Sequence, residues 1–364
     1  MDASLLPTIV KLQKEVIILA NIKAFFKRKD IVFSPKRYGI DALGAMAQGL
    51  FCSLLVGTII KTLGERIGLP FLVDAGNFAS AMSGAAMAVA IGYALKAPAL
   101  VLFSLATVGY AANSLGGAGG PLAVLIIAIV AAECGKAVSK ETKVDILVTP
   151  IVTILVGVGL AALIAAPIGK AAAAVGDFIK WATELQPLLM GILVSVVVGA
   201  ALTLPISSAA ICAALGLTGL AGGAAVAGCC AQMVGFAVMS FRENRWGGLV
   251  AQGIGTSMLQ MPNIVKNPKI WIPPILASAI TGPLATCLFK LEMNGAPVSS
   301  GMGTCGFVGQ IGVITGWADK TVTAMDWIGL VLICFVLPAI LTWLISLPLR
   351  KWGWIKEKDL KLDL

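Results

Sequence analysis

One long stretch, Leu204–Gly312, limits the folds open to this chain more than any other. It is too apolar for a soluble loop, yet glycine, proline and uncharged hydrogen-bonding residues interrupt it throughout. Irregular backbone at membrane depth persists only where protein buries it or water reaches it, because lipid offers no hydrogen-bond partners. We therefore interpret this stretch as the lining of a solute site. Close helix packing explains some of its glycines, but packing does not require the Gln, Asn and Arg residues among them.

The rest of the chain places this stretch in a membrane protein. Hydrophobic residues make up 58% of the sequence and charged residues only 12%, whereas soluble domains carry about 25% charged residues. The sequence therefore predicts an all-α polytopic membrane protein. Its length fits about eight to ten transmembrane helices. Several apolar pieces between Leu204 and Gly316 are too short to cross, so we expect broken helices there and at least one re-entrant segment.

Basic residues gather at the two ends of the chain. Of the 27 Lys and Arg residues, eight precede Tyr38 and five follow Leu349. Basic flanks mark the cytoplasmic side of a membrane protein, so we expect both termini in the cytoplasm. Three regions are predicted: a basic amphipathic cytoplasmic arm over residues 1–36, a transmembrane permease domain over 37–349 and a cytoplasmic tail over 350–364. The net charge of +9 is explained by these flanks, and no nucleic-acid partner is expected.

Residues suited to catalysis or metal binding are sparse. The chain has eight cysteines without C-x-x-C spacing and no histidine, which disfavours a zinc or iron site. No G-x-S-x-G elbow and no phosphate-binding P-loop motif is present. We therefore expect no catalytic residues, no metal and no cofactor, and we interpret the protein as a transporter rather than an enzyme.

Two segments repeat one pattern. Ala47–Leu55 and Ala251–Leu259 share A-Q-G-[LI]-x-x-S-[LM]-L. Transporters are often built from duplicated halves, with the solute held where broken helices of the halves meet. The repeat suggests two related halves, although chance similarity is the alternative in a chain so rich in Gly, Ala and Leu.

Uncharged polar side chains are the chemistry available for binding a solute. Amides and hydroxyls both donate and accept hydrogen bonds, which suits a polyhydroxylated ligand. The predicted solute-binding residues are Gln48, Asn77, Gln232, Gln252, Ser257, Gln260, Asn263, Thr304 and Gln310. Burying an unpaired amide costs about 1–3 kcal/mol, so these residues should converge on a wet cavity, with Gln48 facing Gln252 across it. The structural alternative is that Gln252 only ties two helices together.

Charged residues within the membrane domain are few. Arg242, Glu243 and Glu292 are the candidates for a charged site or gate. Arg242 and Glu243 could equally form a cytoplasmic turn with a salt bridge. Helix N-termini in the broken stretch could hold an anionic group, so a small organic anion is an alternative solute.

A family resemblance is carried by four segments. Lys36–Gly49, Phe241–Asn244, Ala251–Gln260 and Gly301–Gly306 resemble phosphotransferase system (PTS) enzyme IIC-like membrane proteins, a family that includes proteins named as regulators of perfringolysin O expression. The similarity extends over roughly Ser34–Leu349. Its glycine-rich motifs are typical of the family but are not catalytic signatures.

The resemblance implies a permease of the bacterial cytoplasmic (inner) membrane that moves a sugar-like solute and pairs as a homodimer in the bilayer. Any phosphoryl transfer would be performed by separate cytoplasmic PTS subunits. The sequence lacks the Gly-Ile-Thr-Glu-Pro loop of better-known sugar enzyme IIC proteins, and Glu243 and Glu292 are the nearest candidates for its acidic role.

Two other functions remain open from the sequence. One is an ion-coupled carrier of a small organic anion. The other is a membrane sensor or regulator of gene expression that signals through the basic N-terminal arm.

Overall fold

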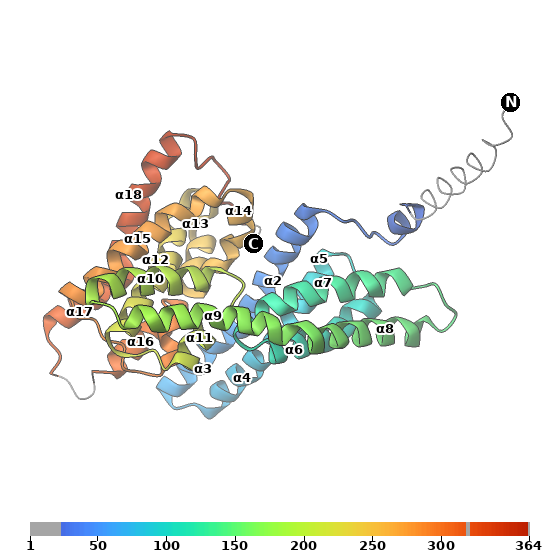
Figure 1. Ribbon diagram of the computed structural model, residues 1–364, viewed down its shortest axis with the longest axis horizontal. Coiled ribbons are helices and arrows are strands. Elements are labelled where there is room, and N and C mark those ends of the chain that lie inside the picture. Colours follow the sequence, from blue (N-terminus) through green and yellow to red (C-terminus); the bar gives the residue numbers. More distant parts are fainter. Residues whose placement is uncertain (1–22, 318–320, 363–364) are drawn as a thin grey trace.

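The computed structural model in Figure 1 describes residues 23–317 and 321–362. Helices account for all the named elements in these residues, and the only strand-like feature is an isolated bridge between Gly219 and Met293. The prediction of an all-α protein is confirmed. Most of the predicted N-terminal arm, residues 1–22, lies outside the described residues.

Most helices of the first half of the chain form one lobe, at the right of Figure 1. The helices of this half are α2 (Ala42–Leu50), α3 (Val56–Ile67), α4 (Pro70–Ala81), α5 (Ser83–Ala94), α6 (Ala99–Gly116), α7 (Gly120–Val138) and α8 (Asp145–Leu160). Of these, α3 and α4 lie at the lower centre of Figure 1. The core of the lobe contains the fully buried side chains of Met46, Met87, Leu105 and Ile127. The chain reverses between α6 and α7 at Gly117, whose φ of 50° and ψ of −123° suit glycine.

One continuous helical stretch connects the two lobes. Helix α8, a π-helical turn and α9 (Ala166–Thr183) together span 39 residues. Such a helix is about 58 Å long, roughly twice the thickness of the hydrocarbon core. Its second part carries Lys170, Asp177 and Lys180, and Figure 1 shows it running from one lobe into the other.

The second half is organised around α12 (Gly219–Met239). The other helices of this lobe are α10 (Pro187–Thr203), α11 (Ser208–Leu215), α13 (Phe241–Val250), α14 (Met261–Lys266), α15 (Ile272–Pro283), α16 (Val308–Thr315), α17 (Ala324–Val331) and α18 (Leu337–Lys351). Helix α12 packs against α10, α15 and α18. It is therefore enclosed by protein along most of its length.

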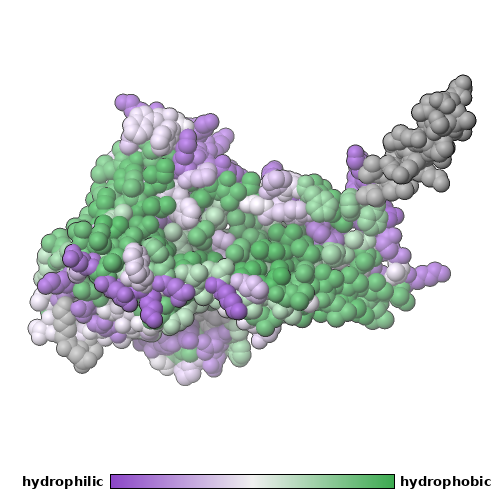
Figure 2. All heavy atoms as spheres, viewed as in Figure 1, coloured by the Kyte–Doolittle hydropathy of each residue, from purple (hydrophilic) through white to green (hydrophobic). Residues whose placement is uncertain are grey.

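Six helical stretches of the described residues are long and apolar enough to cross a membrane, or seven if the α4–α5 pair, bent by 51°, is one span. The predicted range of about eight to ten exceeds this count. One of the six stretches, Ala99–Val138, contains both α6 and α7, and the apolar α10 has only 17 residues. The predicted broken stretch does contain short helices, because α11 and α16 have eight residues each and α14 has six. Figure 2 shows apolar side chains over much of the surface of both lobes, as a lipid-facing protein requires.

Glycines bring three helices of the second half into backbone contact. A Cβ atom on Gly228 of α12 would lie 1.9 Å from the carbonyl oxygen of Ser195 on α10. One on Gly282 of α15 would lie 2.1 Å from the carbonyl oxygen of Gly191, also on α10. The positions of α10, α12 and α15 therefore depend on residues without side chains.

A buried ion pair lies on α7, and its lysine also binds the end of the N-terminal arm. Lys136 Nζ lies 3.0 Å from Glu133 Oε2, and the Lys136 side chain is 1% exposed. Lys136 also donates hydrogen bonds to the carbonyl oxygens of Asp30 and Leu95, while the Tyr38 hydroxyl donates to Glu133. The i,i+3 pair on α7 thus also anchors the chain that enters α2.

Arg37, at the start of the π-helical turn that precedes α2, reinforces this anchor. Its Nη2 donates to Asp30 Oδ2 and to the Leu95 carbonyl oxygen, both at 2.6 Å. The hydrogen bond from Arg37 holds the pKa of Asp30 below its ordinary value. Nearby, Arg28 and Lys29 both pair with Glu141 in the loop after α7.

We predict that Gly228→Ala lowers the free energy of unfolding by about 1–3 kcal/mol, because the new methyl group overlaps backbone that cannot move away. Gly159→Ala in α8 is the matched control, since no atom would lie within 4 Å of a Cβ atom at that residue. Thermal unfolding in detergent should show a lower Tm for the first variant and an unchanged or higher Tm for the second. Equal Tm values would contradict the proposed backbone contact.

We predict that Lys136→Met destabilises the protein by about 3–5 kcal/mol, because it leaves Glu133 buried without its counter-charge. The double variant Lys136→Met/Glu133→Gln should recover much of that loss. Tm measurements on both variants and on the wild type provide the check. If the double variant is no more stable than Lys136→Met, the loss of stability comes mainly from lost packing and not from the unpaired charge of Glu133.

Candidate functional site

A cavity of about 460 Å³ lies where the two lobes meet, between α2 of the first half and α14 of the second. This volume lies within the usual range of small-molecule sites, about 300–1,000 Å³. Its lining residues are Lys36, Ile40, Asp41, Gly44, Ala45, Gln48, Tyr93, Ala94, Leu259, Pro262, Asn263, Lys266, Lys361 and Leu362. The cavity is therefore the candidate site for a small solute.

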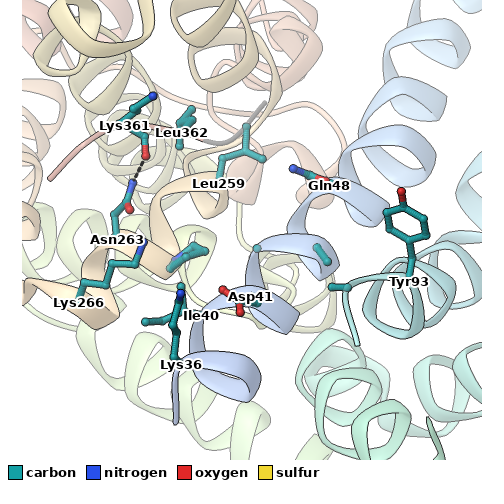
Figure 3. A pocket seen from close by; sticks show the side chains of 14 residues that line it. Lys36, Ile40, Asp41, Gln48, Tyr93, Leu259, Asn263, Lys266, Lys361 and Leu362 are labelled. Atoms are coloured by element: carbon teal, nitrogen blue, oxygen red, sulfur yellow. Dashed lines mark hydrogen bonds between the residues drawn. The ribbon is translucent and has the colours of Figure 1, made fainter. Parts of the chain in front are cut away.

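The side chains around this cavity combine several hydrogen-bonding groups with positive charge. Figure 3 shows Asn263 and Lys266 on one side, Gln48 and Tyr93 on the other, and Asp41 between them. An ionised carboxylate accepts hydrogen bonds only, whereas amides and the phenol both donate and accept. The set can bind hydroxyl groups from several directions.

The two segments that share the repeated pattern contact each other where the lobes meet. A Cβ on Gly255, in the second A-Q-G segment, would lie 2.2 Å from the ring of Phe51, in the first. Pro262 similarly packs against Gly44, with 3.3 Å between its Cγ and a Cβ placed on that glycine. Both segments contain a π-helical turn, at Phe51–Leu55 and Ala251–Gly255. The structure thus brings the two segments together, and a common origin of the halves stays a prediction.

Three of the predicted residues form a chain of amide contacts beside the cavity. Gln252 Nε2 donates to Ser240 Oγ and to the carbonyl oxygen of Gly248, both at 2.9 Å. Its Oε1 accepts from Gln260 Nε2 at 2.9 Å, and Gln260 Oε1 accepts from Asn263 Nδ2 at 2.9 Å. Gln252 and Gln260 are fully buried, so only Asn263 of the three reaches the cavity.

A second polar cluster lies between α10, α12 and α15. Thr203 Oγ1 is 2.7 Å from Ser257 Oγ and donates to Gln232 Oε1 at 3.3 Å. The indole of Trp271 donates to the same Gln232 oxygen at 2.8 Å, and Gln232 Nε2 lies 3.4 Å from Ser278 Oγ. Gln232 and Ser257 are thus buried among helices, with protein partners for their polar groups.

Thr304 and Gln310 contact sulfur atoms of α12. Thr304 Oγ1 lies 3.6 Å from Met233 Sδ, and Gln310 Nε2 lies 3.2 Å from Cys230 Sγ. Gln310 Oε1 is buried and has no hydrogen-bond partner among the described residues. That oxygen retains the capacity to accept a hydrogen bond from water or a solute.

The remaining predicted residues lie elsewhere. Asn77 is exposed on α4, which lies at the lower edge of Figure 1, away from α14. Glu243 pairs with Arg350 on α18 at 2.8 Å rather than with its neighbour Arg242, which is exposed. Glu292 is exposed and accepts a hydrogen bond from Asn294.

Of the nine predicted residues, the structure therefore places Gln48 and Asn263 at the cavity. Sequence reasoning missed Lys36, Asp41, Tyr93, Lys266 and Lys361, which also line it. One signal for Asp41 was available, because a carboxylate at the start of an apolar span is rare and often functional.

We predict that Gln252→Ala lowers the free energy of unfolding by about 1–3 kcal/mol, because it leaves buried partners of the amide unsatisfied. The solute affinity of the folded fraction should stay unchanged, since Gln252 does not line the cavity. Measuring Tm and solute affinity on one purified variant separates the two roles. A loss of affinity without a loss of stability would instead place Gln252 in the site.

Comparison with known proteins supplies the family. The family model described as "Phosphotransferase system, EIIC" matches residues 40–362, which includes all four segments that carry the resemblance except Lys36–Gly39. No curated protein and no solved structure matches the chain. Since the family model extends over nearly the whole sequence, this multi-pass membrane protein belongs to the PTS enzyme IIC family of membrane transporter components.

Proposed function

We propose that the protein is the permease of a sugar phosphotransferase system and that it binds a sugar-like solute in the cavity between α2 and α14. The observation that carries the proposal is the cavity itself, which lies at the meeting point of the two lobes in a member of the enzyme IIC family. Transporters commonly hold their solute between two halves that move relative to each other.

The lining of the cavity suits a sugar on chemical grounds. Asp41, Gln48 and Asn263 supply acceptors and donors for ring hydroxyls, and Leu259 and Pro262 supply apolar surface for the faces of the ring. Sites of this kind combine an apolar lining with a few placed polar groups. The Gln310 oxygen, which has no partner among the described residues, is a further predicted contact if the solute moves toward α12.

A second candidate solute is a small organic anion. Lys36, Lys266 and Lys361 line the cavity together with a single carboxylate, that of Asp41. The positive charge would attract an anion, and transport would then be coupled to an ion rather than to phosphorylation.

Three further features belong to the proposal. Both termini face the cytoplasm, as the basic flanks indicate. The membrane is the bacterial inner membrane, where cytoplasmic PTS subunits can reach the arriving sugar. The protein works as a homodimer, which mass measurement in nanodiscs would test.

Uptake into proteoliposomes tests the function. Labelled sugars and labelled small carboxylates are offered with and without a phosphorylated PTS partner subunit. Sugar accumulation that requires the partner supports the proposal. Carboxylate uptake driven by an ion gradient would replace it with the second candidate, and saturable binding without any uptake would favour a sensor.

We predict that Asp41→Asn and Gln48→Ala each weaken solute binding about tenfold, the effect of losing one to two hydrogen bonds in a buried site. Asp177→Asn and Gln186→Ala, which change exposed residues away from the cavity, are the matched controls and should bind like the wild type. Equilibrium binding on purified variants with unchanged Tm is the measurement. Unchanged affinity in both cavity variants would exclude this cavity as the solute site.

A further inference from the structure

The segment after α18 folds back against the second lobe. The chain turns at residues 357–360, and Lys361 and Leu362 then lie at the cavity between α2 and α14. Leu360 is fully buried and Leu362 is 8% exposed. Leu360 and Leu362 are thus part of the packed structure rather than of an exposed tail.

Three amide side chains bind the backbone of this segment. Asn244 makes two hydrogen bonds, donating from Nδ2 to the Leu360 carbonyl oxygen at 2.7 Å and accepting from the Leu362 N–H at 2.8 Å. Gln260 Nε2 donates to the same Leu360 oxygen at 3.0 Å, and Asn263 Nδ2 donates to the Lys361 carbonyl oxygen at 2.8 Å. Main-chain hydrogen bonds with pockets for alternate side chains are a recurring mode of peptide recognition.

Asn244 is held in place by an unusual local backbone. The next residue, Arg245, has φ 52° and ψ −149°, a region that residues other than glycine rarely adopt. Only glycine fits at position 248 beside Asn244, since a Cβ atom on Gly248 would lie 2.1 Å from Asn244 Cβ. The α13 helix is thus kinked where it presents the amide to the tail.

The two leucines anchor the segment in different lobes. Leu360 belongs to a cluster of the second half with Phe236 and Ile264. Leu362 belongs to a cluster made mainly of first-half residues such as Ala42, which Met258 and Leu259 of the second half also join. Four residues at the end of the chain therefore connect the lobes.

The segment also separates two cavities. Lys361 lines both the 460 Å³ cavity and a second one of about 220 Å³. Asn263 and Lys266 line both as well. The wall between the two cavities therefore includes the docked segment, and its departure would join them.

We propose that Asn244, Gln260 and Asn263 form a peptide-binding site whose ligand is the chain's own segment Asp359–Leu362, and that docking of this segment closes one side of the cavity. The inference rests on the proposed function in one respect: it assumes that the solute binds in this cavity. Because the amides bind backbone and the anchors are leucines, the charge of the Lys361 side chain is not needed for docking.

The test measures access to the cavity directly. Ala45→Cys places a thiol on the cavity wall, and its reaction with a bulky polar maleimide is followed at that position by mass spectrometry. Two changes undock the segment: a chain ending at Lys358, and the nearly isosteric Asn244→Asp in the full-length chain, which sets a carboxylate against the Leu360 carbonyl oxygen. A chain ending at Leu362 keeps every described contact and is the matched control for the truncation.

We expect Asn244→Asp to label at position 45 about tenfold faster than the wild type, because one to two net hydrogen bonds are lost from the docking equilibrium. The chain ending at Lys358 lacks the segment altogether and should label at least as fast. The native Cys287, which is exposed and not part of the cavity lining, should label at the same rate in every protein. Adding the synthetic peptide DLKLDL to the chain ending at Lys358 should restore slow labelling, and a peptide with both leucines of DLKL replaced by serine should not.

Equal labelling of wild type and Asn244→Asp would overturn the proposal, as would a truncated chain that the peptide fails to protect. If the truncated chain does not fold, the full-length Asn244→Asp protein still decides the outcome. The labelling reaction is run without solute. If the cavity is later found to bind no sugar, the proposed function is contradicted, but the labelling result still tests docking of the segment.

Discussion

The structure depends on one constraint: backbone and amide groups that are removed from water inside an apolar protein must find partners. The second half of the chain departs from regular α-helix over Ala251–Gln260, and side chains meet the constraint there. Gln252 satisfies the Gly248 carbonyl and fixes Gln260, which with Asn263 binds the backbone of the tail. Irregular backbone survives here because protein supplies the hydrogen bonds that lipid cannot.

This use of amides changes how the polar residues of such a chain should be interpreted. A buried Gln in an apolar segment indicates either a bound solute or a nearby break in helical hydrogen bonding, since both leave groups to satisfy. Gln252 is of the second kind, because it donates to the Gly248 carbonyl oxygen next to the π-helical turn Ala251–Gly255. Gln232 lies inside regular helix α12 and instead joins helices through the side chains of Thr203, Trp271 and Ser278. Gln48 and Asn263 differ from Gln232 and Gln252 because they line a cavity.

Glycine packing gives the amide network a rigid frame. Helices α10, α12 and α15 approach through Gly191, Gly228 and Gly282, so the wall that supports the α13–α14 region cannot easily shift. The first lobe contacts that region through Phe51 on Gly255 and Pro262 on Gly44. Under the proposed function, the cavity between the two lobes is where transporters commonly hold their solute.

The sequence by itself determined the class of the protein, the family and the positions of the breaks, because apolar composition, basic flanks and glycine-rich motifs are local properties. The A-Q-G repeat also indicated that Ala47–Leu55 and Ala251–Leu259 belong near one another, and they do contact. Only the tertiary structure decided which polar residues reach a cavity. Asp41, Tyr93, Lys266 and Lys361 come from four separate parts of the chain, and no spacing in the sequence relates them. The same holds for the end of the chain, which the sequence presents as a basic cytoplasmic tail. Its role depends on Leu360 and Leu362 entering two different cores, and burial of that kind is set by long-range packing rather than by local pattern.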